Sequence, residues 1–379
     1  MNIFKLLLSL CVLSQVNSYT INIHPRSNKI AYIKNIDTFD STTVKKLRND
    51  FAKYPLLIFT DLDNLPPDNF LNFVKLFDKY HDKRVIDDPL SYPTKMLQPF
   101  DQIPEVPNVS PRGYGTLEDY YNIKKLELEP FEPFKDNYIW HSDMVGHDFK
   151  LPNVVTGFQI IKQPLIGGNT DFISGETIYE NLTPEEKIAC ENMLIEINRR
   201  KFITGQMLQD YSGVNRLEKF IPNEEGTVKI PLLYHNEESK VPSVLLMPTF
   251  FEKVNGWNVN DSRKWIKNFM NDKVLPHRIS IQWKKGDIAV FNNRRFIHSS
   301  EPANNYLKNK NSQERLLFQT FIPTTKSLKS YIPDEKNVYA AYNVGWQPDI
   351  ETSIISAHNS IKHAKSKNIT KDGLYIVAN

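Results

Sequence analysis

The stretch Trp283-Lys-Lys-Gly-Asp-Ile-Ala-Val-Phe-Asn-Asn-Arg-Arg-Phe-Ile-His298 shows how the second half of this chain is built. Just before it, apolar and polar residues alternate from Ile279 to Gln282, as in a half-buried strand. Residues 284–287 predict a turn, and the apolar run 288–291 predicts the strand that pairs with the first one. The stretch therefore predicts two paired strands followed by a histidine at position 298.

Similar patterns on both sides of this stretch predict short strands with helices between them. Apolar runs predict strands at residues 56–59, 153–161 and 315–322. Apolar spacing and a capping box of Thr183 and Glu186 predict helices at residues 68–79, 183 to about 200, and 261–271. Residues 85–137 are rich in Pro, Asp and Tyr and predict a long irregular segment. We expect a mainly β fold with inserted helices, a sandwich or jelly roll rather than alternating βαβ units.

Composition limits the class of protein. The chain has 379 residues, 40% of them hydrophobic and 24% charged, which is typical of a globular protein. Its 47 basic and 44 acidic residues give a net charge of +3, which argues against nucleic acid as a partner. Without an internal repeat or a change in composition, we expect a single domain over residues 19–379, with a less regular C-terminal extension at about 345–379.

The first residues differ from the rest of the chain. A run of apolar residues at 6–13 is followed by small and polar residues up to Ser18, and this pattern predicts a signal peptide at 1–18. The run is too short for a membrane span of about 20 residues, and no later segment resembles one. A buried amphipathic start is the alternative. We expect a secreted protein or one held in the lumen of the secretory pathway, with Cys190 left without a disulfide partner. Asn-x-Ser/Thr glycosylation acceptors occur at Asn108, Asn181, Asn260 and Asn368.

His141 and Asp143 are the strongest candidates for metal ligands. Two positions apart on an extended strand, their side chains point to the same face. Two histidines and one carboxylate leave open positions on iron, as Fe(II) oxygenases require. With nine histidines in the chain, such spacing also arises by chance: we interpret His235-Asn-Glu237 as a turn without a ligand role. A zinc hydrolase built on His141, Asp143 and His147 stays open.

Four segments in the same order resemble the taurine dioxygenase (TauD/TfdA) family, over most of residues 50–325. They are Leu57-Ile-Phe-Thr-Asp with the Pro-Pro-Asp that follows, Trp140-His-Ser-Asp, Gly167-Gly-Asn-Thr-Asp-Phe, and the block from Trp283 to His298 followed by Arg315. The resemblance implies a double-stranded β-helix, the jelly roll of clavaminate synthase-like enzymes. It also implies a dioxygenase that uses Fe(II), 2-oxoglutarate and O₂, hydroxylates a small organic substrate, and releases succinate and CO₂.

The same resemblance assigns roles to individual residues. His141, Asp143 and His298 would be the catalytic iron ligands. Arg315 and Thr170 would bind the distal carboxylate of 2-oxoglutarate, which a guanidinium can hold through two hydrogen bonds. A surface salt bridge is the alternative for Arg315.

Two positions concern the substrate, and one segment concerns the placing of Arg315. Asn137 matches a substrate-contacting position of the family, although an Asn that caps a loop would look the same. Gln319 stands where sulfonate-using members carry an Arg, so taurine would lose its counter-charge here. Residues 304–309 lengthen the interval between His298 and Arg315 and predict an enlarged loop. We expect a small-molecule substrate other than taurine.

A jelly-roll binding protein without catalysis is the alternative to an enzyme. The sequence leaves open whether the protein is a homo-oligomer.

Overall fold

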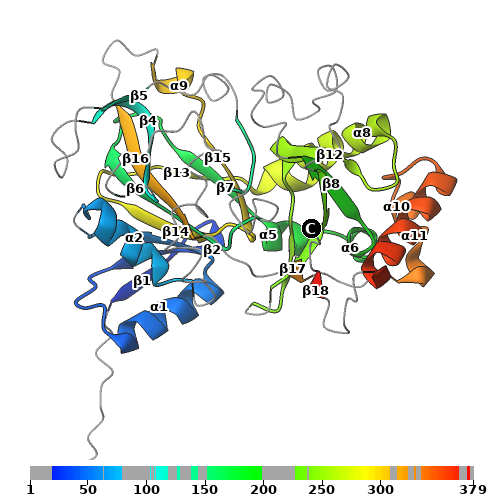
Figure 1. Cartoon of the computed structure of the whole chain (residues 1–379), viewed down its shortest axis with the longest axis horizontal. Helices are drawn as coiled ribbons and strands as arrows, with labels where there is room; N and C mark the ends of the chain where they lie inside the picture. Colours follow the sequence, from blue (N-terminus) through cyan, green and yellow to red (C-terminus); the bar gives the residue numbers. More distant parts are fainter. Residues whose placement is uncertain are drawn as a thin grey trace, which may run out of the picture.

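The computed structural model describes residues 19–62, 64–78, 103, 106, 108–117, 126–128, 138–143, 152–198, 227–236, 239–307, 314–322, 328–329, 334–366 and 374–375. Figure 1 shows two lobes side by side, the first built around a large sheet and the second around smaller sheets and helices. The predicted signal peptide lies outside the described residues. Among the described helices, none has the length and apolarity of a membrane span.

The large sheet of the first lobe has eight strands in the order β1-β2-β3-β14-β6-β16-β4-β5. Its strands are β1 Thr20–His24, β2 Ser27–Lys34, β3 Leu56–Phe59, β4 Ser110–Leu117, β5 Leu126–Leu128, β6 Val155–Lys162, β14 Ile288–Asn292 and β16 Arg315–Ile322. Helices α1 (Ser41–Lys53) and α2 (Pro67–Lys75) cover its outer face, where residues such as Phe51, Phe70 and Val74 are buried against the sheet. The predicted strands 56–59, 153–161 and 315–322 and the first helix are thus confirmed, with small differences at their ends.

A smaller sheet of three strands lies against the inner face of the large one. Its order is β13-β7-β15, with β13 Ile279–Ile281, β7 Thr170–Ser174 and β15 Phe296–Ser300. Phe158 and Phe291 from the large sheet and Phe172 and Trp283 from the smaller sheet and its following turn form the core between the two. Two facing sheets, mostly antiparallel, confirm the jelly-roll prediction.

One strand pairing was wrong. The sequence suggests that 279–283 and 288–291 pair across the turn at 284–287, but β13 pairs with β7, and β14 pairs with β3 and β6. All five residues of β14 are buried, which is typical of a central strand with neighbours on both sides. The turn therefore carries the chain from one sheet to the other.

The segment expected to be irregular, 85–137, contains two strands, β4 and β5, which form an edge of the large sheet. The sequence does not predict β4, because this strand contains Pro111, Gly113 and Gly115, and proline and glycine normally weaken a strand. Gly113 has a φ of +112°, and a Cβ there would lie 1.9 Å from the carbonyl oxygen of Arg315. A glycine is needed because β4 passes so close to the start of β16.

The second lobe is formed mainly by the chain between β7 and β13. Its elements are α5 Gly175–Glu180, α6 Pro184–Glu191, β8 Leu194–Asn198, β9 Thr227–Pro231, β10 Leu233–His235, β11 Pro242–Val244, β12 Phe251–Val254 and α8 Val259–Phe269, which a π-helix at Met270–Val274 continues. The capping box of Thr183 and Glu186 is present as predicted. The predicted helix to about residue 200 was too long, because the β-branched Ile195 and Ile197 continue as a strand.

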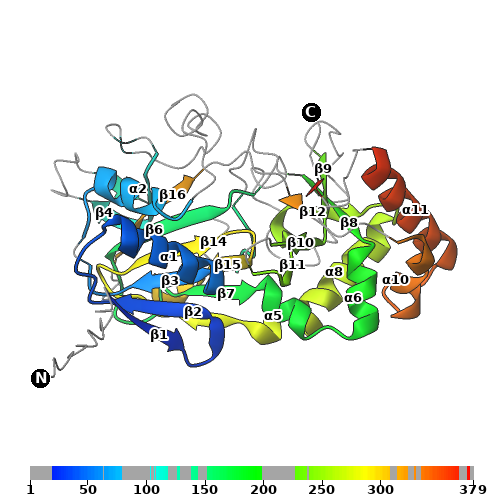
Figure 2. The same cartoon turned by 90° about the horizontal axis from the view of Figure 1, so that it is seen from below.

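The C-terminal elements belong to the second lobe. They are β17 Leu328–Lys329, α10 Ala340–Asn343, α11 Ile350–Ser366 and β18 Leu374–Tyr375, all labelled in Figure 1. Figure 2 shows α10 and α11 at one end of the molecule. Trp346, just after α10, packs against Trp265 and Phe269 of α8. The expected division into one domain with a C-terminal extension stays a prediction.

The second lobe also covers the outer face of the smaller sheet. Trp140, Ile173 and Ile297 point outward from this sheet and belong to the second lobe's core. Because neighbouring residues on a strand point to opposite faces, His141, Phe172 and His298 point inward, between the two sheets. The second lobe thus backs the wall from which the candidate metal ligands project.

Candidate metal centre

His141 and His298 face each other across two backbone segments. The amide of His141 donates to the carbonyl oxygen of His298 at 3.0 Å, and the amide of His298 donates back at 2.9 Å. The two imidazole centroids are 4.3 Å apart. Asp143 follows two positions later, as the sequence spacing predicts.

The three side chains converge on a single point. His141 Nε2 is 3.7 Å from Asp143 Oδ1, and His298 Nε2 is 3.7 Å from Asp143 Oδ2. One donor atom from each residue lies within 4.8 Å of the others. Two imidazoles and a carboxylate at these separations fit a divalent iron ion that keeps open positions for other ligands.

Hydrogen bonding and packing orient the imidazoles. His141 Nδ1 lies 2.6 Å from the carbonyl oxygen of Ile139, which can accept a hydrogen bond only if Nδ1 is protonated. The lone pair then sits on Nε2, which faces the centre. The His298 ring is held by Phe172, which stacks on it at 6.0 Å, and by Phe291, edge to face at 5.0 Å.

Burial sets the charges of the centre. It lowers the pKa of His298 well below 6.5, and the neighbouring His141 lowers it further, so His298 is neutral and able to bind a metal. Burial raises the pKa of Asp143, while His141, a hydrogen bond from Thr156 and the charge of Arg112 oppose this rise. A cation between the three residues would compensate the buried carboxylate.

Arg315 and Thr170 meet between the two sheets. Arg315 is 6% exposed, its Nε donates to the carbonyl oxygen of Gly168 at 2.8 Å, and its Nη2 donates to Thr170 Oγ1 at 3.2 Å. Trp283 Nε1 also donates to Thr170 Oγ1, at 2.9 Å. Since that oxygen already accepts two hydrogen bonds, its own proton is available for a ligand.

The register of the smaller sheet relates this pair to the triad. His298 is opposite Phe172, and Thr170 is two residues along the same face of β7. Two residues of a strand span about 7 Å. A five-carbon dicarboxylate could reach from the metal centre to Arg315 over such a distance.

A second polar pair, Arg112 and Gln319, lies in the large sheet. Arg112 Nε donates to Gln319 Oε1 at 3.2 Å, and the Arg112 charge acts on Asp143. Gln319 shares the inward face of β16 with Arg315, because the two are four residues apart. The sequence gives no sign that Arg112 lies near the triad, because the proline and glycines around it do not predict a strand.

Other candidates are placed differently or not at all. His235 ends strand β10, opposite Pro242, and the turn toward β11 begins directly after it, where the carbonyl oxygen of Asn236 accepts a hydrogen bond from the Lys240 amide at 3.0 Å. The short helix α9 (Asn304–Leu307) occupies the first part of the predicted enlarged loop. Asn137 and His147 lie outside the described residues, so the predicted substrate contact and the alternative zinc site are not placed.

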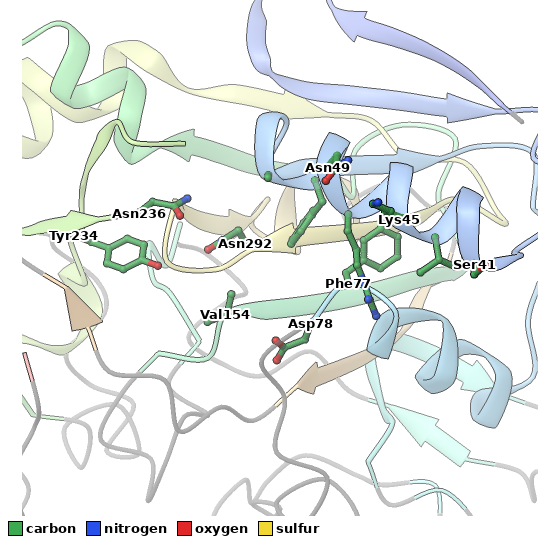
Figure 3. A pocket seen from close by; sticks show the side chains of 13 residues that line it. Ser41, Lys45, Asn49, Phe77, Asp78, Val154, Tyr234, Asn236 and Asn292 are labelled. Carbon is green, nitrogen blue, oxygen red and sulfur yellow. The ribbon is translucent and has the colours of Figure 1, made fainter. Parts of the chain in front are cut away.

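A cavity of about 560 Å³ lies elsewhere, beside α1. Figure 3 shows Tyr234, Asn236, Asn292 and Asp78 around one end of it, and Lys45 and Asn49 of α1 at the other. The residues that line it do not include His141, Asp143 or His298. This cavity is thus separate from the triad.

Among curated proteins, this chain is similar to alpha-ketoglutarate-dependent xanthine dioxygenases from two organisms. The alpha-ketoglutarate-dependent xanthine dioxygenase of Schizosaccharomyces pombe is 24% identical over 330 residues, which cover 71% of this chain and 79% of that protein. The protein of the same description from Emericella nidulans is 23% identical over 247 residues, covering 52% of this chain and 66% of that protein.

Solved structures share the fold. A taurine dioxygenase from Burkholderia xenovorans has a TM-score of 0.57 at 14% identity, covering 83% of this chain and 91% of that one. AAD-2, solved in complex with Mn(II) and N-oxalylglycine, has a TM-score of 0.56 at 14% identity, covering 81% and 98%.

The family described as "Taurine catabolism dioxygenase TauD, TfdA family" matches residues 26–320, which include the smaller sheet, most of the large sheet and all three residues of the triad. The chain belongs to this family and is an Fe(II)- and 2-oxoglutarate-dependent dioxygenase.

Proposed function

We propose that His141, Asp143 and His298 hold the iron, that Arg315 and Thr170 hold the distal carboxylate of 2-oxoglutarate, and that the enzyme hydroxylates a small organic substrate. One observation carries the assignment. The three metal-binding side chains converge within 4.8 Å, and Thr170, the partner of Arg315, lies on β7 two residues from the position opposite His298. Family membership and the complete triad favour catalysis over the binding-only alternative.

Each group of the protein has a defined task in this reaction. Arg315 is buried and charged, so it supplies a desolvated counter-charge for one carboxylate, and the Thr170 hydroxyl donates the neighbouring hydrogen bond. The core around Phe172 and Phe291 excludes water from one side of the triad. When bound, Fe(II) and 2-oxoglutarate supply the oxidising chemistry, in which O₂ is consumed, succinate and CO₂ are released, and the substrate gains a hydroxyl group.

For the substrate, we propose an oxopurine or a similar planar heterocycle with amide-like groups. Both curated relatives are described as xanthine dioxygenases. Gln319, four residues after Arg315 on the same face of β16, carries an amide whose Nε2 donor and carbonyl acceptor match a ring amide, and its Oε1 also accepts a hydrogen bond from Arg112. Gln319 itself offers no positive charge to a sulfonate such as taurine; the charged group at this place is the guanidinium of Arg112, which donates to Gln319 Oε1.

The first experiment is an anaerobic titration of the metal-free protein with Fe(II) and then with 2-oxoglutarate. We expect both to bind, and we expect His298→Ala to lose metal affinity. If 2-oxoglutarate did not bind, or if His298→Ala bound iron as well as the unmodified protein, the assignment would be wrong, and the second result would favour a site that includes His147.

The second experiment measures succinate release with xanthine, hypoxanthine and taurine as candidate substrates. We expect release to be stimulated by an oxopurine and not by taurine. Stimulation by taurine alone would overturn the proposed substrate class while leaving the metal assignment intact.

We also propose that residues 1–18 direct the chain into the secretory pathway. Support comes from the apolar run at 6–13 and the small residues that follow it. Expression of the full chain in a eukaryotic cell, followed by N-terminal sequencing of the mature protein, tests this proposal. A protein that begins at Tyr19 is expected, and one that keeps its first residues would contradict cleavage.

A further inference from the structure

Asp143 lies beyond the backbone pairing that holds the two histidines. His141 and His298 exchange two backbone hydrogen bonds, whereas Ser142 and Asp143 are in no strand. A metal ligand must keep its carboxylate in one orientation to bind tightly. Other groups therefore have to position Asp143.

The side chain of Asn293 takes the place of a neighbouring strand. Its Oδ1 accepts a hydrogen bond from the Asp143 amide at 2.8 Å, and its Nδ2 donates to the Asp143 carbonyl oxygen at 2.8 Å. The amide group of Asn293 thus pairs with both backbone groups of Asp143, as a peptide group would in a sheet. Asn293 follows directly after β14 and is completely buried.

Thr156 of β6 holds the carboxylate itself. Asn153 Nδ2 donates to Thr156 Oγ1 at 2.9 Å, so the threonine proton is directed toward another acceptor, Asp143 Oδ2, at 3.1 Å. Asn293 Nδ2 also lies 3.1 Å from the carbonyl oxygen of Asn153 and connects the two halves of the network. Thr156, Asn153 and Asn293 are all 0% exposed, and water cannot replace their hydrogen bonds without a rearrangement.

We propose that Thr156, Asn153 and Asn293 position Asp143 for the metal. Thr156 donates to Oδ2, so the lone pairs of Oδ1 would remain for the metal. The three are positioning residues, since they act through Asp143 and do not contact the metal. This inference rests on the proposed function, namely on Asp143 being an iron ligand.

The test uses the full chain in its metal-free form and Fe(II) as the probe, under anaerobic conditions. Thr156→Val removes the hydroxyl at nearly constant shape, and Thr156→Ser keeps it. We expect Thr156→Val to weaken Fe(II) binding by about ten- to hundredfold, the usual effect of losing a partner of a metal ligand, and Thr156→Ser to bind like the unmodified protein.

The matched control is Thr320→Val. Thr320 is another completely buried threonine, on the neighbouring strand β16, and its hydroxyl donates to the carbonyl oxygen of Asn108 at 2.8 Å, away from the triad. We expect this variant to lose a similar amount of thermal stability without a change in Fe(II) affinity. If Thr156→Val does not fold, Thr156→Ala removes the same hydroxyl without crowding, with the same expectation.

Each outcome bears on one claim. If the unmodified protein binds no Fe(II), the proposed function fails, and with it the basis of this inference. If it binds Fe(II) and Thr156→Val binds equally well, or if Thr156→Ser is as weak as Thr156→Val, the positioning role is wrong and the metal assignment stands.

Discussion

At the scale of single residues, Arg315 is a buried cation whose hydrogen bonds go to neutral groups. Its Nε and Nη2 donate to the Gly168 carbonyl oxygen and to Thr170 Oγ1. Burial lowers its pKa, while Tyr306 and Glu301 act in the opposite direction. A guanidinium kept charged at such a place is well suited to bind an anionic group.

Arg315→Gln should therefore weaken 2-oxoglutarate binding. A hydrogen bond to a charged group contributes about 1.5–3 kcal/mol, so we expect the KM for 2-oxoglutarate to rise by about ten- to hundredfold. Succinate release measured against 2-oxoglutarate concentration is the readout. The control is Arg48→Gln on the exposed side of α1, which should leave the KM unchanged. An unchanged KM in Arg315→Gln would contradict the role.

His298 predicts how the metal-free protein responds to pH. Its pKa lies below 6.5 in the folded state, so the unfolded chain takes up the proton more readily. Neutral His298 therefore leaves the free energy of unfolding undiminished above pH 6.5, and this free energy decreases as the pH falls below 6.5. Urea unfolding in the presence of a chelator should show this loss, and His298→Leu should show less of it. An equal loss in both proteins would assign the effect to other histidines.

The sequence indicates the three residues of the triad but not the residues that hydrogen bond to Asp143 or act on its charge. His141, Asp143 and His298 could be named, because their spacing and the surrounding segments resemble a known family. Thr156, Asn153 and Arg112 could not, since a threonine in a strand or an arginine in a glycine-rich segment has many structural roles. Their contribution depends on which strands become neighbours, and a strand's neighbours cannot be read from its own residues.

At the scale of elements, the close packing of α2 on the large sheet depends on a glycine in β6. A Cβ added at Gly157 would lie 2.3 Å from Cγ2 of Val74, which is completely buried on α2. The helix and the sheet touch here without room for a methyl group.

Gly157→Ala should destabilise the protein by about 1–3 kcal/mol, the usual cost of overpacking a core. The double variant Gly157→Ala with Val74→Ala should be more stable than the sum of the two single variants predicts, because the valine has made room. Urea unfolding of the four proteins gives this coupling, and simple additivity would show that the contact is not responsible.

Elements with a strong local pattern were predicted well, and elements defined by their partners were not. The strand at 315–322 matches β16 residue for residue, because its apolar run is nearly continuous. β4 was missed and α6 was extended into β8, since neither Gly113 nor Ile195 shows locally which structure the surrounding sheet imposes. The pairing of β13 with β14 was wrong for the same reason.

At the scale of the whole molecule, a buried ion cluster joins the two lobes. Arg295, between β14 and β15, contacts Glu176 of α5 at 2.6 Å, and Lys29 of β2 contacts Glu176 at 3.2 Å. Arg295 and Glu176 are each 1% exposed. The cluster links strands of the first lobe to the first helix of the second.

Glu176→Gln should destabilise the protein strongly, because it leaves Arg295 buried without its counter-charge. We expect about 3–5 kcal/mol from denaturant unfolding. Glu180→Gln is the control: its carboxylate also contacts Lys29, at 2.8 Å, but is 44% exposed, so we expect a loss below about 1 kcal/mol. Equal losses would mean that burial does not determine the effect.

The pairing of β3 with β14 has a consequence for how the enzyme matures. Strand β3 lies near the start of the chain and β14 far along it, with most of the second lobe between them in sequence. Contacts between such distant segments form slowly, because a long loop must close first. On the ribosome, the large sheet cannot close before Ile322, the end of β16, has emerged, and by then His298 has emerged as well. We therefore expect iron to enter a nearly complete protein, and folding intermediates to be unable to take it up.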